Sequence, residues 1–156
     1  MRIAIGCDNL GLGLKPEVTG LLRQRGIDYR EFGALDGQQP DYPDVAERVA
    51  MSVRNGEFER GILICGTGIG MAIAANKVPG IRAAVVHDPY SAERARKSNN
   101  AQILTMGALV IGPRVARQLV SIWLDSEFEG GDSARKVQKV AAIEEHFRSE
   151  DSRTRP

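Results

Sequence analysis

The feature that most constrains this chain is an apolar run at residues 61–64 that leads through Cys65 into a glycine-rich turn, with an apolar helix expected over 71–78. In an open α/β sheet, ligands gather at the carboxyl ends of the strands, and Cys65 stands at such an end. Glycines at 66, 68 and 70 let backbone N–H groups converge on an anion or oxyanion, helped by the positive end of the next helix. The pattern predicts a thiol beside an oxyanion-binding loop, which indicates chemistry on an oxygen-rich substrate.

Apolar strand patterns alternate with amphipathic helix patterns along the whole chain. The expected strands are Arg2–Cys7, Asp28–Phe32, Gly61–Ile64, Ala83–Val86 and Gln102–Met106. This alternation predicts an α/β fold with one doubly wound parallel sheet, whose ligands gather at the carboxyl ends of the strands.

The expected helices carry apolar residues on one face. The inward sets are Leu14, Val18, Leu21 and Leu22; Val45, Val49 and Val53; and Val115, Leu119, Ile122 and Trp123 in a helix over Pro113–Leu124. A charged helix is expected over Pro89–Ser98, a loop rich in Gly, Gln and Pro before Asp41, and a last helix over about Ser133–Phe147. Residues 1–148 are expected to form a single domain, followed by a polar, frayed tail at 149–156.

Composition excludes several classes of protein. The chain has 156 residues, enough for one domain with a core, and 21 basic against 20 acidic side chains give a net charge of +1. Because the charges nearly balance, we expect no nucleic-acid or membrane surface. No apolar run approaches the roughly 20 residues of a membrane span. The chain opens as a strand without a signal peptide, so Cys7 and Cys65 are expected to be reduced thiols in a cytoplasmic protein. His87 and His146 form no metal-binding spacing with the cysteines.

The glycine loop alone is a weak signal, because a tight strand-to-helix turn explains it about equally well. A dinucleotide site is disfavoured. Glu31 lies inside the second strand rather than at its end, and the first helix lacks the glycine fingerprint.

Taken together, several motifs resemble the ribose-5-phosphate isomerase B and galactose-6-phosphate isomerase family. They are Gly6-Cys7-Asp8, Asp41-Tyr42-Pro43, Ile64 to Gly70, Ala74 to Arg82, Tyr90-Ser91-Ala92 and the region of Asn99. The resemblance runs from residue 2 to about residue 145. It implies a Rossmann-like three-layer sandwich with a five-stranded parallel sheet and a C-terminal helix. It also implies a homodimer or dimer of dimers with shared active sites, and no metal or organic cofactor.

The family interconverts an aldose phosphate and its ketose through a cis-enediol. By resemblance, Cys65 is the base and Thr67 relays or donates a proton at the substrate oxygens. The thiolate is the basic form of cysteine, so this assignment is chemically reasonable. The remaining implied contacts are the N–H groups of Gly66, Gly68, Ile69 and Gly70 as an oxyanion nest, and Asp8, Asn9, Tyr42, Ser98, Asn99 and Lys136 at the substrate. Asn99 would reach the site of a neighbouring subunit.

Each of these residues also has a structural interpretation. Cys65 could be a small buried apolar residue, a common fate of cysteine, and this is the interpretation we favour for Cys7, which ends a strand and has no basic neighbour. Lys77 and Arg82 are interpreted as structural or rim charges. His87 is interpreted as a polar residue at a strand end, and His146 as a surface residue.

The chain departs from the family pattern at four positions. Asn9 and Ser98 stand where family members acting on pentose phosphates carry histidines, and serine cannot take up a proton near neutral pH as imidazole does. Leu109 and Asp132 replace arginines of the phosphate site, where only Lys136, with Arg135 beside it, keeps basic character. These losses weaken a phosphate site, because charge-assisted contacts are strong.

One class of substrate accounts for the missing ring-opening histidine. A tetrose 4-phosphate cannot close a furanose, since the hydroxyl it needs is esterified, so its isomerase has no ring to open. The segments Ser98–Ile103 and Ser133–Val137 resemble the tetrose-phosphate branch of the family. Ribose 5-phosphate remains the general family substrate. An isomerase of an unphosphorylated sugar, a non-catalytic sugar-phosphate-binding protein and a nucleotide-binding module remain as alternatives.

Overall fold

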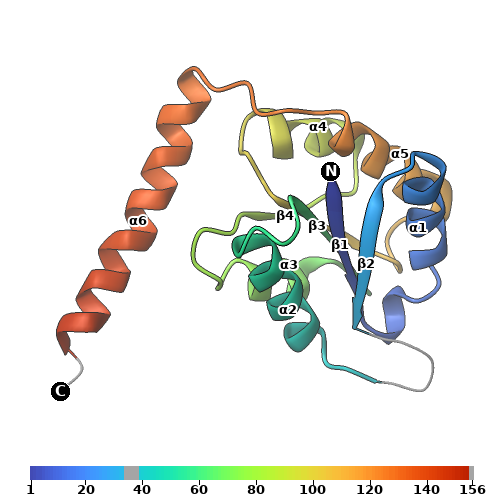
Figure 1. Cartoon of the computed structure of the whole chain (residues 1–156), viewed down its shortest axis with the longest axis horizontal. Coiled ribbons are helices and arrows are strands. Elements are labelled where there is room, and N and C mark those ends of the chain that lie inside the picture. Colours follow the sequence, from blue (N-terminus) through green and yellow to red (C-terminus); the bar gives the residue numbers. More distant parts are fainter. Residues whose placement is uncertain (34–38, 155–156) are drawn as a thin grey trace.

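The computed structural model describes residues 1–33 and 39–154, and for residues 150–154 it describes the backbone alone. Within that part of the chain, five strands form one parallel sheet in the order β2-β1-β3-β5-β4 (Figure 1). The strands are β1 Arg2–Cys7, β2 Asp28–Gly33, β3 Arg60–Cys65, β4 Ala83–Val85 and β5 Ile103–Gly107. The predicted parallel sheet is therefore confirmed, and β3, which carries the cysteine, is its middle strand.

Helices cover both faces of the sheet. They are α1 Lys15–Gln24, α2 Tyr42–Arg54, α3 Ile69–Ala75, α4 Pro89–Lys97 and α5 Pro113–Leu124. Successive strand residues point to opposite faces, so Ile3 and Ile5 of β1 pack with α1, α4 and α5, whereas Ala4 packs with α2 and α3. The result is the expected three-layer α/β/α sandwich with an apolar core on each side of the sheet.

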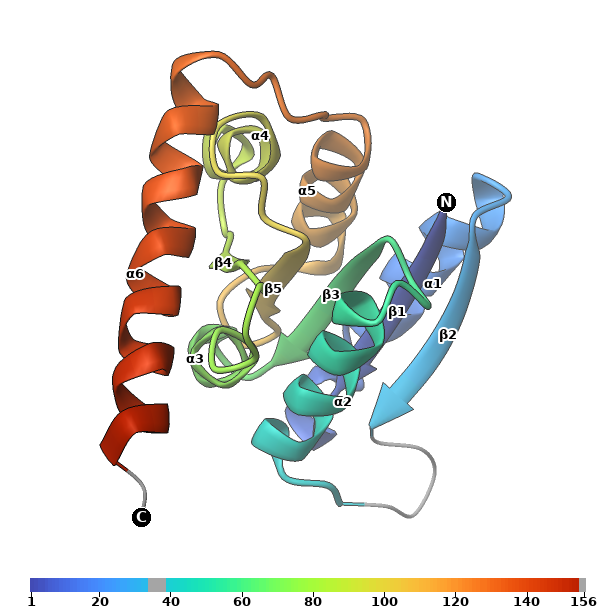
Figure 2. The same cartoon turned by 60° about the vertical axis from the view of Figure 1, so that its left-hand side comes forward.

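A long helix, α6 (Asp132–Thr154), runs past the ends of α4 and α3 on the β4 side of the molecule (Figure 2). It continues beyond Phe147, where the sequence predicted its end, so residues 149–154 of the expected tail are helical and residues 155–156 lie outside the described part. The backbone N–H of Gly80 donates to both carboxylate oxygens of Glu144, at 3.1 and 2.9 Å. Val140, Ile143 and Phe147 of α6 stay more than half exposed.

Two local predictions were wrong. The helix expected over 71–78 begins at Ile69 and ends at Ala75, because the Asn76 side chain donates to the carbonyl of Ala83 (2.9 Å) and accepts from its N–H (2.7 Å), joining the helix end to β4. Val115 is 39 % exposed rather than inward, because the buried stripe of α5 is centred on Ala116, Leu119, Val120 and Trp123 and leaves Val115 at its margin.

Two connections complete the layout. A short 3₁₀ turn, Asn9–Gly11, follows β1 and was not expected from the sequence. The loop predicted before Asp41 contains residues 34–38, which lie outside the described residues. In the described part of the chain, no helix combines the length and apolar character needed to cross a bilayer.

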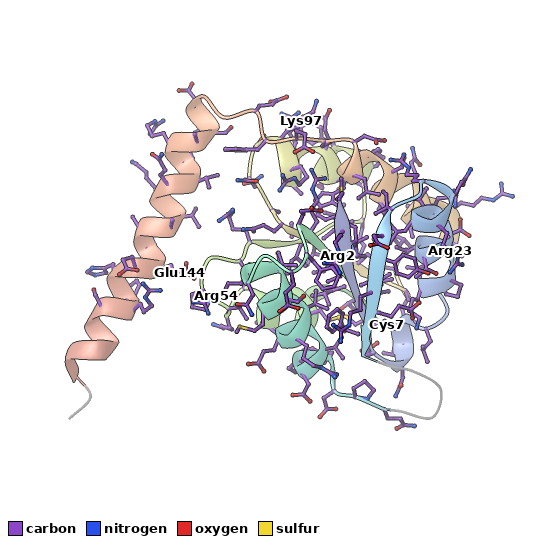
Figure 3. The ribbon with its side chains drawn as sticks, in the orientation of Figure 1. Arg2, Cys7, Arg23, Arg54, Lys97 and Glu144 are labelled. Atoms are coloured by element: carbon purple, nitrogen blue, oxygen red, sulfur yellow. The ribbon has the colours of Figure 1, made fainter. Side chains whose placement is uncertain are left out.

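Cys7 ends β1 with its side chain fully buried in the core (Figure 3), and both cysteines are free thiols, as the sequence predicted. Burial raises the pKa of the Cys7 thiol from 9.0 to about 11. The expectation that Cys7 has no basic neighbour was wrong, because Lys15 acts to lower this pKa, but burial outweighs it. Cys7 is therefore a neutral core residue at ordinary pH.

This burial predicts an alkaline loss of stability. Between pH 9 and pH 11 the unfolded thiol ionises while the folded thiol stays protonated, so the free energy of unfolding falls as pH rises through this window. The full loss is about 3 kcal/mol, since each of the two pH units corresponds to about 1.4 kcal/mol. Thermal unfolding from pH 8 to 11 should show a steeper decline for the wild type than for Cys7→Ala. Parallel curves would contradict the assignment.

Candidate active site

Cys65 is the last residue of β3, and its side chain is 5 % exposed. The backbone N–H of Gly68, three residues further along the loop, donates to its sulfur at 3.0 Å. The thiol predicted beside the glycine loop is thus in direct contact with that loop.

Glycine is required at two points where the loop meets β5. Gly68 has φ +79°, and a Cβ there would lie 2.9–3.0 Å from backbone atoms of Met106. A Cβ on Gly107 would lie 2.6 Å from the Cα of Thr67. The Thr105 hydroxyl donates to the carbonyl of Gly68 at 2.9 Å. These contacts seat the loop on the end of the neighbouring strand.

Thr67 is exposed at the tip of the loop, where a substrate can reach its hydroxyl. Its Oγ1 accepts a hydrogen bond from the N–H of Ile69 at 3.3 Å. Two N–H groups of the predicted oxyanion nest, those of Gly68 and Ile69, therefore donate to the side chains of Cys65 and Thr67. The loop is organised around the two residues that the resemblance assigns to catalysis.

Asp8 and Asn9 follow β1 at the same edge of the sheet as Cys65. The Asp8 N–H donates to the carbonyl of Ile64 (3.3 Å), and its carboxylate accepts from the N–H of Gly11 (3.0 Å), which caps the 3₁₀ turn. Asp8 is half-buried and Asn9 is exposed. The Asp8 carboxylate thus has a structural partner as well as a place beside the candidate site.

Tyr42 begins α2 and brings a phenol to the glycine loop. A Cβ on Gly70 would lie 2.7–3.2 Å from the Tyr42 ring, so the ring lies directly against that glycine. The side chain is 44 % exposed. The structure therefore brings Tyr42 to the glycine loop, and its contact with a substrate stays a prediction.

Three further residues lie next to this site, and the sequence analysis assigned none of them to catalysis or substrate binding. Nε2 of His87 accepts the N–H of Gly107 at 2.9 Å, so this histidine holds the end of β5 as a polar strand-end residue. Leu10 and Leu109 both approach Gly66, where a Cβ would meet their methyl groups at 2.9 and 3.4 Å. Leu10 and Leu109 thus form an apolar wall beside Gly66. Its only signal in the sequence was Leu109 in the place of the family arginine.

The other predicted contacts lie at the opposite edge of the sheet. Cys65 pairs with Gly107 at the carboxyl end of the strands, whereas Ser98 and Asn99 precede β5 at its amino end. With Lys136 of α6 they line a hollow of about 550 Å³ beside Arg82 and Asn76. Within one chain, these three residues do not join the Cys65 loop.

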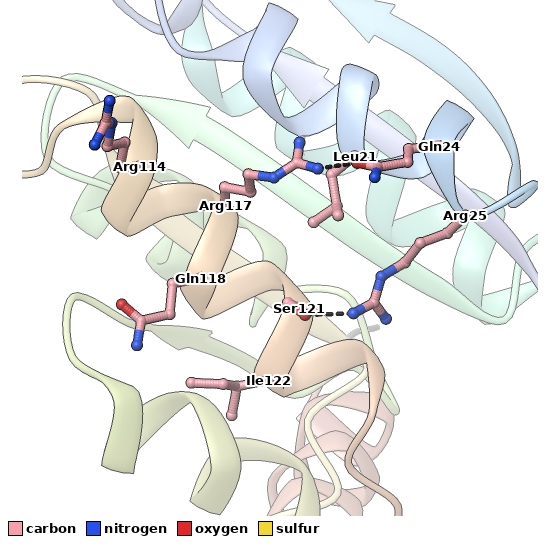
Figure 4. A pocket seen from close by; sticks show the side chains of 8 residues that line it. All are labelled: Leu21, Gln24, Arg25, Arg114, Arg117, Gln118, Ser121 and Ile122. Carbon is pink, nitrogen blue, oxygen red and sulfur yellow. Dashed lines mark hydrogen bonds between the residues drawn. The ribbon is translucent and has the colours of Figure 1, made fainter.

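A separate hollow of about 550 Å³ lies between α1 and α5 (Figure 4). Two of its three arginines are held by neighbours: Arg25 by Asp125 at 2.7 and 2.9 Å, and Arg117 by Glu17 at 3.3 Å. None of the predicted site residues lines it. Across the described residues, no three or more His, Cys, Asp or Glu side chains cluster so as to hold a metal ion.

Comparisons with known proteins agree on one family for this chain. The family model described as Ribose/Galactose Isomerase matches residues 3–140. "Ribose-5-P isomerase B" of Listeria innocua is 55 % identical over 95 % of this chain and 100 % of its own length. "D-erythrulose-4-phosphate isomerase" of Pectobacterium atrosepticum is 52 % identical over 92 % and 95 %. The solved ribose-5-phosphate isomerase B of Clostridium thermocellum superposes with a TM-score of 0.91 at 46 % identity, over 94 % of this chain and 99 % of that one. The chain belongs to the Ribose/Galactose Isomerase family.

Proposed function

We propose that this protein is an aldose–ketose isomerase of a small sugar phosphate, with Cys65 as its base. The observation that carries the proposal is the N–H of Gly68 on the Cys65 sulfur, at the carboxyl end of the middle strand. The isomerase names of the full-length relatives support the reaction class. A cytoplasmic location belongs to the same proposal, because both cysteines are free thiols.

The chemistry needs one base and a place for negative charge. The Cys65 thiolate takes the proton from the carbon beside the carbonyl, which gives a cis-enediol, and returns a proton to the former carbonyl carbon. Thr67 moves a proton between the two oxygens. Backbone N–H groups of Gly66 and Gly70 steady the charge that develops on oxygen. One carbon of the sugar is oxidised as its neighbour is reduced, so the isomerisation needs no external oxidant or reductant.

The working unit is proposed to be a homodimer, or a dimer of dimers, with sites shared between chains. Two observations support this. Ser98, Asn99 and Lys136 lie at the opposite edge of the sheet from Cys65, so they can serve a site only on another copy. We call Ser98, Asn99 and Lys136 the half-site. Beside it, α6 leaves apolar surface uncovered at Val140, Ile143 and Phe147.

A tetrose 4-phosphate is the proposed first substrate, with ribose 5-phosphate as the alternative. Ser98 offers no imidazole for ring opening, and an acyclic tetrose phosphate requires none. Relatives of both names are similar to this chain, so the names do not decide between the two sugars. An unphosphorylated sugar is disfavoured because Lys136 stays exposed in the hollow that Ser98 and Asn99 line.

A sugar-phosphate-binding protein without catalysis is the second candidate function. It is disfavoured by the arrangement of the loop, because a binder needs neither the N–H on sulfur nor a hydroxyl exposed beside it.

The base is tested by replacing each cysteine. Cys65→Ala should lower kcat by about 10²–10⁴-fold, since a general base is lost. Cys7→Ala should keep most activity, because that thiol is a neutral core residue. Turnover and circular dichroism of both variants would check this, and near wild-type turnover by folded Cys65→Ala would refute the assignment.

Shared sites are tested by mixing two inactive chains. Cys65→Ala and Asn99→Ala each spoil one half of every site, but a mixed dimer holds one site with both native halves. Refolding the two together should restore about a quarter of wild-type activity, since half the dimers are mixed and each has one good site. Activity no higher than that of the separate variants would contradict a shared site.

The sugar is tested by comparing kcat/KM for erythrulose 4-phosphate and ribulose 5-phosphate. We expect a clear preference for the tetrose, and Ser98→Ala should change its turnover little because no ring proton has to move. Adding imidazoles with Asn9→His and Ser98→His should not raise activity on the tetrose. A preference of the wild type for the pentose would show that another group or solvent opens the ring.

A further inference from the structure

Residues 125–131, here called the connector, carry the chain from α5 to α6 without helix or strand (Figure 1). The connector is attached to the last turn of α4, where the N–H of Glu129 donates to the carbonyl of Lys97 at 3.1 Å. This attachment brings the start of α6 next to the end of α4.

The side chain of Glu129 makes two ion pairs at the same place. Its carboxylate lies 3.7 Å from Arg94 and 3.6 Å from Lys97, which is labelled at the end of α4 in Figure 3. The Glu129 side chain is 56 % exposed, so these pairs contribute little to the stability of the fold. Their effect is on where the connector sits.

Arg94 links the connector to the two polar residues that follow α4. Its Nη1 donates to the hydroxyl of Ser98 at 3.3 Å, and its carbonyl accepts from the side-chain amide of Asn99 at 3.0 Å. One residue therefore contacts Glu129, Ser98 and Asn99.

Beyond Glu129 the path to Lys136 is short. Gly130 and Gly131 both have positive φ, at 71° and 56°, and the N–H of Ser133 donates to the carbonyl of Gly130 at 3.1 Å. α6 begins at this turn and carries Lys136 into the hollow that Ser98 and Asn99 line. A displacement of Glu129 therefore displaces Lys136 relative to both.

We propose that Arg94 and Glu129 are positioning residues that set the distance between Ser98–Asn99 and Lys136, and so shape the half-site that one chain offers to the substrate of another. The inference rests on the proposed function of that half-site. Neither residue touches the Cys65 loop, so the effect is on substrate binding rather than on proton transfer.

A second anchor keeps the connector folded when Glu129 is changed. The Glu127 carboxylate contacts the buried Arg60 at 2.5 Å and the buried Arg96 at 3.5 Å. Arg60 also donates to the carbonyls of Trp123 and Ser126, at 2.9 and 3.1 Å. These contacts do not involve Glu129, which makes Glu129→Gln a mild substitution.

The connector offers a matched control. Asp125, at its other end, accepts hydrogen bonds from both terminal guanidinium nitrogens of Arg25 on the α1–α5 face (Figure 4 shows Arg25). These bonds involve no residue of the half-site. Asp125→Asn removes one carboxylate from the same connector and breaks shorter contacts than Glu129→Gln does. It should lower the melting temperature at least as much.

The experiment compares the two variants in the intact enzyme. Glu129→Gln should raise KM for the sugar phosphate roughly tenfold, as for a weakened contact to a charged group, and leave kcat unchanged. Glu129→Asp, which keeps the charge, should recover part of the loss, and Asp125→Asn should keep wild-type KM. Unchanged KM in Glu129→Gln, or equal effects of both variants, would overturn the proposal.

Hydrogen exchange separates this inference from the proposed function. Amide exchange over Ser133–Lys136 should be faster in Glu129→Gln than in Asp125→Asn, whatever the substrate. A wild-type protein that isomerises no sugar phosphate refutes the proposed function. Equal exchange in the two variants refutes the positioning role.

Discussion

The close backbone contact between the Cys65–Gly70 loop and the end of β5 is the constraint on which the candidate site depends. The N–H groups of Ala108 and Leu109 donate to the carbonyls of Cys65 and Gly66, at 2.8 and 3.0 Å. Gly68 and Gly107 lack a Cβ where the two segments meet, and any side chain there would push them apart. Because the loop is held on a strand rather than free in solvent, the N–H of Gly68 can stay aimed at sulfur. Cys65 and the glycine loop beside it therefore share one rigid support.

The direction of the strands decides which residues can cooperate. In a parallel sheet, every residue that follows a strand lies at one edge, and every residue that precedes a strand lies at the other. Asp8 and Thr67 follow strands and lie with Cys65, whereas Ser98 and Asn99 precede β5 and do not. A single chain thus presents two halves of the proposed site. The reactive half, with Cys65, lies at one edge, and the polar half, with Ser98 and Asn99, lies at the other. Given the substrate contacts that the family resemblance assigns to these residues, this division supplies a physical reason for the proposed dimer.

Most of the sheet could be predicted from the sequence, because short apolar runs and glycine turns are local signals. The roles of Thr67, Asp8 and Tyr42 were predicted only from the family resemblance. The position of Cys65 at a strand end depended only on the run before it and the glycines after it. The wrong predictions came from tertiary contacts: α3 ends early because Asn76 bonds to Ala83, and Lys15 lies near Cys7 only in the folded chain. The wall of Leu10 and Leu109 joins residues from two distant turns, so no local pattern announces it.

That wall also bears on where the charge of the substrate is held. Leu10 and Leu109 cover the Gly66 side of the loop with methyl groups, so this side of the reactive half offers no cation to a phosphate. In the polar half, Lys136 lies exposed on α6 in the hollow beside Ser98 and Asn99, and Arg82 lines the same hollow. The proposed enzyme therefore places the base on one chain and the phosphate contact on another. The distance between the two is then fixed by how two copies pack, and it selects the length of the sugar that can bridge them.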